Sequence, residues 1–223
     1  MARPNKNYEP KKEALAQTAF DLFAKQGYEN VTITQIMRAA GLTKAGMYHY
    51  FSSKEEILDA AIDYGIAQDL QKLRADLEGC PVDEKMLRFA RGNTTHSDLA
   101  HKLLYYKGSN KDSYAAYRIR ERSIHADIPV MEEIIREGME KGVYTVEYPH
   151  QVAEFLVLLA KAIVETNILP HASREERLIR MQAFLQLTEI WLHPTPAHLA
   201  AIAAMLREEL SNTQEARYED GSN

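Results

Sequence analysis

The sequence predicts an all-α protein with an N-terminal three-helix unit and a larger C-terminal helical bundle. Apolar side chains recur at three- and four-residue steps along most of the chain, and no stretch alternates as a strand does. A length of 223 residues with 45% hydrophobic side chains suffices for a sizeable core. The single cysteine, Cys80, excludes an internal disulfide and any multi-cysteine metal site.

The first two helices have clear boundaries. Apolar periodicity from Pro10 predicts an amphipathic helix that ends at Gly27. Thr32 is a good N-cap for a second helix, because its hydroxyl oxygen can accept a hydrogen bond from a free backbone N–H. Gly41 ends that helix, since the following turn requires a residue that tolerates positive φ.

A short third helix and a long fourth helix follow. Thr43 caps the third helix, which runs to Tyr50 and has an inner face of Met47, Tyr50 and Phe51. Ser53 and Glu56 have the spacing of a capping box, and apolar periodicity then continues to residue 77.

The rest of the chain is predicted to be helical as well. Helices are expected at residues 83–91, 95–107, 112–125, 127–141, 149–167, 173–193 and 197–210. Pro129 is expected to open a helix rather than to kink one. The predicted domains are residues 1–54 and 55–211, followed by a disordered polar tail at 212–223.

The third helix has the properties of a helix that enters a groove. It is slim and polar on its outer side, and the major groove of B-DNA is wide enough to admit such a helix. Charge is also unevenly distributed. Residues 1–54 carry eight basic and four acidic side chains, a net charge of +4, whereas the remainder carries 19 basic and 28 acidic ones, a net charge of −9. A basic head on an acidic body is typical of a DNA-binding protein.

The first 58 residues resemble the DNA-binding domain of the TetR family of bacterial transcription regulators. The resemblance lies in the segment ALAQTAFDLFAKQGYENVTITQIMRAAGLTKAGMYHYFSSKEEIL, which includes the Ala-Gly-Leu turn at 40–42 and the Tyr-x-Tyr-Phe motif at 48–51. It implies a regulator, most often a repressor, that binds a near-palindromic operator in double-stranded DNA as a homodimer and is released by a small-molecule effector. Activation instead of repression stays open, as do the effector and the operator sequence.

Residues at the start of the third helix are candidates for DNA contacts. A helix N-terminus favours phosphate through its free N–H groups and its dipole. Lys44 can donate to guanine O6 and N7, Ala45 can touch a thymine methyl group, and Gly46 leaves room for close backbone approach. The resemblance assigns Tyr48, His49 and Lys54 to DNA contacts, mainly with phosphate. The complete set of expected DNA contacts is Thr32, Thr34, Thr43, Lys44, Ala45, Gly46, Tyr48, His49 and Lys54.

Three of these residues have a structural alternative. Tyr48 would instead pack along the fourth helix, and His49 would be an ordinary solvated side chain. Glycine inside a helix costs about 1 kcal/mol relative to alanine, so Gly46 indicates either a steric requirement near DNA or a loosely formed helix.

The C-terminal region supplies candidates for effector binding and dimerisation. An apolar pocket with a few polar groups is the usual small-molecule site. The candidates for it are Phe89, His96, Tyr105, Tyr106, Tyr114, Tyr117 and His125; each is also compatible with an ordinary core or surface position. Arg118, Arg120 and Arg122 alternate and cannot all face one cavity, so most should be solvated or paired with acids such as Glu121. Two apolar helices predict an intersubunit four-helix bundle, with the alternative that they fill the monomer's own core. The expected interface residues are Phe155, Leu156, Leu159, Ile163, Met181, Phe184, Leu185, Thr188 and Trp191.

Other functional classes find little support in the sequence. There is no phosphate-binding glycine loop and no HExxH motif, so we expect neither an enzyme nor a bound metal or cofactor. The pairs His96/His101 and His193/His198 are five residues apart, or about 140° around a helix, which does not suit a shared metal. A helical adaptor that retains the fold without binding DNA is disfavoured by the basic head. The apolar runs are too short to span a membrane, and no signal peptide is evident, so a cytoplasmic location is expected.

Overall fold

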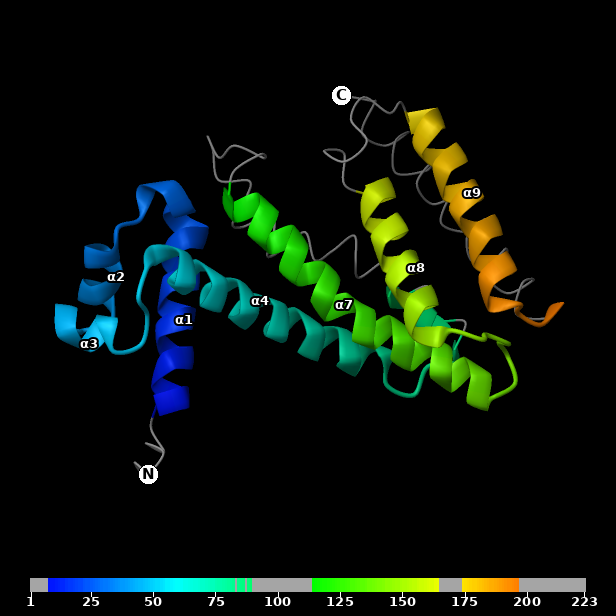
Figure 1. The fold of residues 1–223 in the computed structure, drawn as a ribbon, viewed down its shortest axis with the longest axis horizontal. Helices are drawn as coiled ribbons and strands as arrows, with labels where there is room; N and C mark the ends of the chain where they lie inside the picture. The colour runs from blue at the N-terminus through cyan, green and yellow to red at the C-terminus, as the bar shows by residue number, and fades with distance from the viewer. Residues whose placement is uncertain (1–7, 83, 87, 90–113, 165–173, 197–223) are drawn as a thin grey trace, which may run out of the picture. The chain divides into compact units, whose positions relative to one another are not determined.

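The computed structural model describes residues 8–82, 84–86, 88–89, 114–164 and 174–196 (Figure 1). The regular structure in these ranges is helical, and they contain no β-strand, which confirms the predicted all-α class. The chain divides into two compact units. Residues 1–76 and 92–126 form the first, and residues 77–91 and 127–223 form the second.

The helix-turn-helix lies in the first unit. Its elements are α1 (Tyr8–Gln26), the 3-10 helix η1 (Tyr28–Asn30), α2 (Ile33–Ala39), α3 (Lys44–Tyr48) and α4 (Lys54–Leu77). α1 contacts α2, and α2 contacts α3. Phe23, Met47 and Phe51 are at most 2% exposed in a shared core. Burial of these large side chains against α1 and α4 therefore holds the two short helices in place.

The caps of α2 and α3 confirm the predicted start sites. Thr32 Oγ1 accepts from the Gln35 N–H, and Gln35 Oε1 accepts from the Thr32 N–H at 2.7 Å, which completes a capping box. Thr43 Oγ1 accepts from the Gly46 N–H at 3.2 Å. Gly41 has φ of 65°, as the predicted turn requires. Local side-chain chemistry thus defines the geometry of the motif.

The cap of α4 differs from the prediction in one partner. Ser53 Oγ accepts from the Glu56 N–H at 3.1 Å, as expected. The Glu56 carboxylate, however, accepts from the N–H and hydroxyl of Ser52 and not from the Ser53 N–H. The long Glu side chain reaches one residue further back, so two separate donors are satisfied where a strict capping box was predicted.

The long helix α7 (Tyr114–Glu140) corrects two predictions. The separate helices expected at 112–125 and 127–141 are continuous in the described residues, and Pro129 lies inside α7 and does not open a helix. An interior proline removes one backbone hydrogen bond and strains the preceding turn. Its neighbours Ile128 and Val130 are 8% and 2% exposed, so core packing on both sides outweighs the local cost.

The compact unit around the helix-turn-helix extends beyond residue 54. Ala115 and Ile119, near the start of α7, belong to the same core as Phe23 and are 4% and 3% exposed. Most of α4 belongs to this unit as well. The first part of α7 and α4 are therefore structural components of the head.

The second unit contains α8 (Pro149–Val164) and α9 (Arg174–Leu192), which pack against each other. Their positions agree with the helices predicted at 149–167 and 173–193 within the described residues, while the predicted helices at 95–107 and 197–210 and the tail at 212–223 lie outside them. The Lys161 ammonium lies 3.0 Å from the buried Asp127 carboxylate, which ties α8 to α7. A Cβ added to Gly138 would lie 2.1 Å from the Tyr144 ring, so only glycine fits there.

Candidate nucleic-acid interface

One surface of the first unit presents most of the residues expected to contact DNA. Met47 of α3 and Ile36 of α2 are at most 1% exposed, and their burial turns the opposite sides of both helices outward. The exposed members of the predicted set are Thr32, Thr34, Thr43, Lys44, Ala45, Tyr48 and His49, while Gly46 and Lys54 are half-buried. The arrangement leaves a short, mostly polar helix face open to a partner.

Gly46 lies close to the cap of α3. A Cβ built on Gly46 would lie 3.3 Å from Thr43 Oγ1, which is tighter than an ordinary contact, and 3.6 Å from a Leu42 methyl group. The same Thr43 oxygen accepts the Gly46 N–H that caps α3. Gln35 occupies the equivalent position of α2 behind Thr32, so the cap itself does not require glycine; the absence of a side chain at Gly46 keeps α3 slim.

Lys44 and Tyr48 lie one turn apart on α3. Lys44 Nζ is 6.0 Å from the centroid of the Tyr48 ring, within reach of a weak cation–π contact. Tyr48 is 48% exposed, which does not fit the alternative that its ring packs along α4. Both polar ends therefore face outward, where a phosphate or base edge can reach them.

Lys54, the first residue of α4, lies against an aromatic ring. Its Nζ is 4.2 Å from the centroid of the Tyr28 ring, at cation–π distance. Burial lowers the pKa of the Lys54 ammonium, and burial together with the Glu55 and Glu29 carboxylates raises the pKa of Tyr28 to about 12. The ring thus holds the ammonium at a fixed place beside the start of α4, which favours a positioned phosphate contact.

The start of α1 lies beside the end of α3, a contact that sequence reasoning missed. The Tyr8 ring stacks on Tyr50 with centroids 5.1 Å apart and meets the His49 ring edge-on at 5.5 Å. His49 is therefore more than an isolated solvated residue. A polar tail before a first helix gives no periodic signal, so Tyr8 had no pattern that would have assigned it to this cluster.

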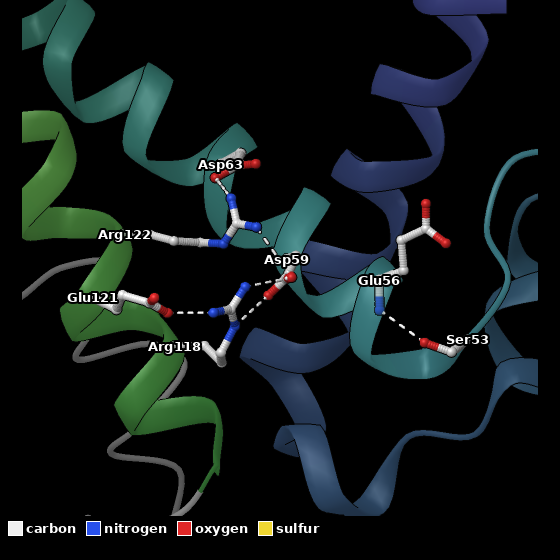
Figure 2. Close-up of polar contacts among 7 residues, drawn as sticks. All are labelled: Ser53, Glu56, Asp59, Asp63, Arg118, Glu121 and Arg122. Carbon is white, nitrogen blue, oxygen red and sulfur yellow. Dashed lines mark hydrogen bonds and ion pairs between the residues drawn. The ribbon is translucent and has the colours of Figure 1, made fainter.

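A second cluster joins α4 to α7 behind the interface (Figure 2). Arg118 Nε and Nη2 donate to the two carboxylate oxygens of Asp59 at 2.8 and 2.6 Å, and Arg118 Nη1 donates to Glu121. Arg122 lies 3.0 Å from Asp59 and also donates to Asp63. The pairing of Arg118 with Glu121 confirms the sequence expectation. The α4 partners are 59 residues away in the chain and have no local signature.

Acid should weaken this cluster. Burial alone would raise the pKa of Asp59, but hydrogen bonds from Arg118 and Arg122 outweigh it and leave the pKa below its ordinary value. Because the folded-state pKa is the lower one, the stabilisation is complete above the unfolded pKa of about 3.9 and is lost as pH falls through the folded value. The melting temperatures of the wild type and of Asp59→Asn should be measured between pH 7 and pH 2. The melting temperature of the variant should fall less steeply with pH than that of the wild type. Equal slopes would contradict this assignment.

The candidate effector residues that the structure describes belong to two different compact units. His96, Tyr105 and Tyr106 lie outside the described residues. Phe89 is 1% exposed in the second unit, whereas Tyr114, Tyr117 and His125 belong to the first. Tyr114 and Tyr117 are 47% and 57% exposed, so in the described structure their rings do not line an enclosed pocket.

The candidate dimer residues fall into two groups. Leu156 and Thr188 are buried inside the second unit, at 1% and 9% exposure, and Thr188 donates to the Phe184 carbonyl. Phe155 is 51% exposed and its ring lies 5.9 Å from that of the half-buried Trp191. Leu159 and Phe184 are half-buried, and the side chains of Ile163, Met181 and Leu185 lie outside the described set. Large exposed apolar side chains not anticipated for the interface are Leu158, Ile179, Leu187 and Ile190.

A comparison with known protein families matches the segment that contains the helix-turn-helix. Residues 15–61, which span most of α1 through the first two turns of α4, match the family described as bacterial regulatory proteins, tetR family. Residues 15–61 are therefore similar to the DNA-binding portion of the TetR family. The match covers the elements that build the exposed α3 surface. The family so described consists of bacterial regulatory proteins.

Curated relatives match about a third of the chain. An uncharacterised HTH-type transcriptional regulator of Bacillus subtilis, YerO, is 38% identical over 77 residues, or 33% of this chain and 27% of the relative. The A-factor receptor protein of Streptomyces griseus is 32% identical over 69 residues, or 31% of this chain and 24% of the relative. The chain thus spans about a quarter of the length of these relatives.

Solved structures extend the likeness in fold to both regions. A TetR-family regulator from Pectobacterium atrosepticum is similar with a TM-score of 0.54 and 17% identity, over 84% of this chain and 95% of that one. A transcriptional regulator from Cytophaga hutchinsonii gives a TM-score of 0.56 and 17% identity, over 80% and 94% of the two chains. At this identity the likeness establishes the fold: a helix-turn-helix followed by a helical C-terminal region.

Membrane spans and metal sites are both absent from the parts of the chain that the structure describes. None of the helices there combines the length and the apolar character that crossing a bilayer requires. The same residues hold no group of three or more His, Cys, Asp or Glu side chains arranged to bind a metal ion.

Proposed function

We propose that this TetR-family chain is a cytoplasmic, ligand-responsive transcriptional repressor that binds a near-palindromic operator as a homodimer. The observation that carries the proposal is the exposed face of α3, where Lys44 and Tyr48 project from a slim helix whose inner residue Met47 is 1% exposed. A helix held this way can lie in the major groove with its N-terminal residues at base edges.

The proposed DNA contacts divide by role. Lys44 and Ala45 read base edges, and Gly46 permits close approach of the backbone. Contacts to phosphate come from hydroxyl, ring and ammonium groups around them and fix the register of α3 without reading sequence. These residues are Thr32, Thr34, Thr43, Tyr48, His49 and Lys54.

Dimerisation is supported by the apolar surface of the second unit. Phe155 and Leu158 of α8 and Ile179 and Ile190 of α9 are each 46–61% exposed, and the two helices pack against each other. An apolar face that wide on one pair of helices is suited to a second copy in a two-fold four-helix arrangement. Two heads would then read two half-sites spaced by about one DNA turn, roughly 34 Å.

The support for effector control comes from the names of similar proteins, and not from a defined pocket in the described residues. One relative is named a receptor protein, and another structure of the same fold is named a fatty acid degradation regulator. We propose that a small molecule binds the C-terminal region and favours a conformer whose heads no longer match the half-site spacing. The tyrosines and histidines of residues 89–125 remain the candidates for that contact.

A mobility-shift experiment with DNA that flanks the protein's own coding sequence tests the proposal. A discrete complex that contains two subunits per fragment, measured by light scattering, is expected. Phe155→Ala, which truncates an exposed interface candidate, should shift the protein toward monomer and weaken the DNA complex. A monomeric wild type, or one that binds no fragment better than unrelated DNA, would contradict it.

A further inference from the structure

We propose that four charged side chains form a latch that positions the DNA-reading head and couples it, through α7, to the second unit. These side chains are Asp59 and Asp63 of α4 and Arg118 and Arg122 of α7 (Figure 2). We call them the α4–α7 latch. The coupling to DNA rests on the function proposed above, whereas the latch itself is a property of the free protein.

The latch has the geometry of a specific connection. Two parallel hydrogen bonds of 2.8 and 2.6 Å join the Arg118 guanidinium to both oxygens of Asp59. Such a fork fixes orientation as well as distance, which a lysine in place of Arg118 would not do. The Arg118 and Asp59 side chains are 19% and 22% exposed, so salt screens this pair less than a fully exposed one.

The spacing of the four side chains fixes the register between the two helices. Asp59 and Asp63 are four residues apart on α4, and Arg118 and Arg122 are four residues apart on α7, so each pair lies along one helix face. Arg122 also contacts Asp59 at 3.0 Å, which links the Arg118–Asp59 pair to the Arg122–Asp63 pair. A displacement of α7 by one helical turn, about 5.4 Å, would leave only one arginine opposite an α4 carboxylate and would lose the other Arg–Asp pair.

The latch acts close to the proposed DNA surface. Asp59 follows Lys54 by five residues, and the Ser53 cap holds the start of the same helix, as Figure 2 shows. Beside the latch, Ala115 and Ile119 of α7 are buried in the core that also holds Met47 of α3. The position of α7 is therefore linked to that of the helices that carry the DNA contacts.

The other half of α7 belongs to the second unit. α7 is continuous from Tyr114 to Glu140, and Ile134 and Ile135 in its second half are 3% and 0% exposed. Lys161 of α8 pairs with Asp127 just beyond the boundary between the units. One continuous helix thus carries the latch arginines in the first unit and buried apolar side chains in the second, and we propose that it transmits the coupling.

Hydrogen–deuterium exchange tests the coupling. The probe is DNA that flanks the protein's own coding sequence, added at saturation so that wild type and variants are fully bound. In wild type, DNA should slow exchange in residues 127–140. Arg118→Gln/Arg122→Gln should reduce that DNA-induced slowing at least fivefold, the lower end of ordinary allosteric coupling.

The matched control is Arg136→Gln, an arginine on the same helix that pairs with Glu132 within α7 and is 56% exposed. It should leave the DNA-induced slowing intact. A latch variant that keeps the wild-type slowing at saturation, even with a lowered melting temperature, would show a merely structural role and overturn the proposal. So would a wild type that binds the DNA without any change in 127–140.

A separate measurement distinguishes failure of the latch from failure of the proposed function. In DNA-free protein, exchange of residues 114–126 should be faster in Arg118→Gln/Arg122→Gln than in Arg136→Gln. If wild type binds no DNA but this difference is present, the latch stands and the DNA-binding function fails. If exchange of residues 114–126 is the same in both variants, the latch is overturned, regardless of the result with DNA.

Discussion

Phe23→Ala is expected to destabilise the DNA-reading head by about 3–5 kcal/mol, the usual cost of deleting a buried phenyl ring. Phe23 is 0% exposed, and its ring packs edge-on against Tyr28 with centroids 5.3 Å apart. The cavity would lie in the core that holds α2 and α3. Hydrogen exchange across residues 15–62 should quicken, and DNA affinity should fall with the fraction of folded head.

The matched control for this substitution is Phe155→Ala. Phe155 is the same residue type but is 51% exposed on α8, so its loss should leave exchange in residues 15–62 unchanged. A destabilisation of less than about 1 kcal/mol for Phe23→Ala would be far below the range for a buried phenylalanine, and would show that the head core is not packed as described.

Lys44→Ala and Lys54→Ala are expected to weaken DNA binding in different ways. Removal of a base-reading side chain at position 44 should cost about 1–3 kcal/mol and relax preference at one or two base pairs. Removal of a phosphate-binding ammonium at position 54 should weaken binding to all sequences about equally and make the salt slope shallower by about 1. Affinities for a panel of single-base operator variants at two salt concentrations separate the two patterns.

Lys72→Ala is the control for charge alone. Lys72 is also on α4, its side chain is 77% exposed, and it lies 3.7 Å from Asp69. Its removal should change affinity little. A sequence-selective effect of Lys54→Ala, or a uniform effect of Lys44→Ala, would mean that the two roles are exchanged.

The helix-turn-helix was predictable because its boundaries depend on local chemistry. Thr32 and Thr43 cap the helices that follow them, and Gly41 has the positive φ that its turn requires. The match of residues 15–61 to the tetR family description likewise lies in one continuous segment. Each of these signals lies within a few residues of the structure it specifies, so sequence reasoning is effective there.

The features that the sequence did not reveal depend on distant partners. Asp59 pairs with Arg118 across 59 positions, and Tyr8 meets His49 from the far end of α1. The local preference of Pro129 predicts a helix start, whereas buried neighbours on both sides keep α7 continuous through it. Tertiary packing overrode a local rule in that case, and no periodic pattern encodes such long-range pairing.

The dependence of DNA affinity on salt tests the central claim most directly. A protein that holds phosphates through lysines, hydroxyls and helix N-termini releases counterions on binding, so log affinity falls linearly with log salt concentration. For the wild-type protein and its own flanking DNA, we predict a steep negative slope of about −0.9 for each phosphate contact. Binding that does not change with salt, or no binding to any such fragment, would contradict the assignment of the α3 surface to DNA.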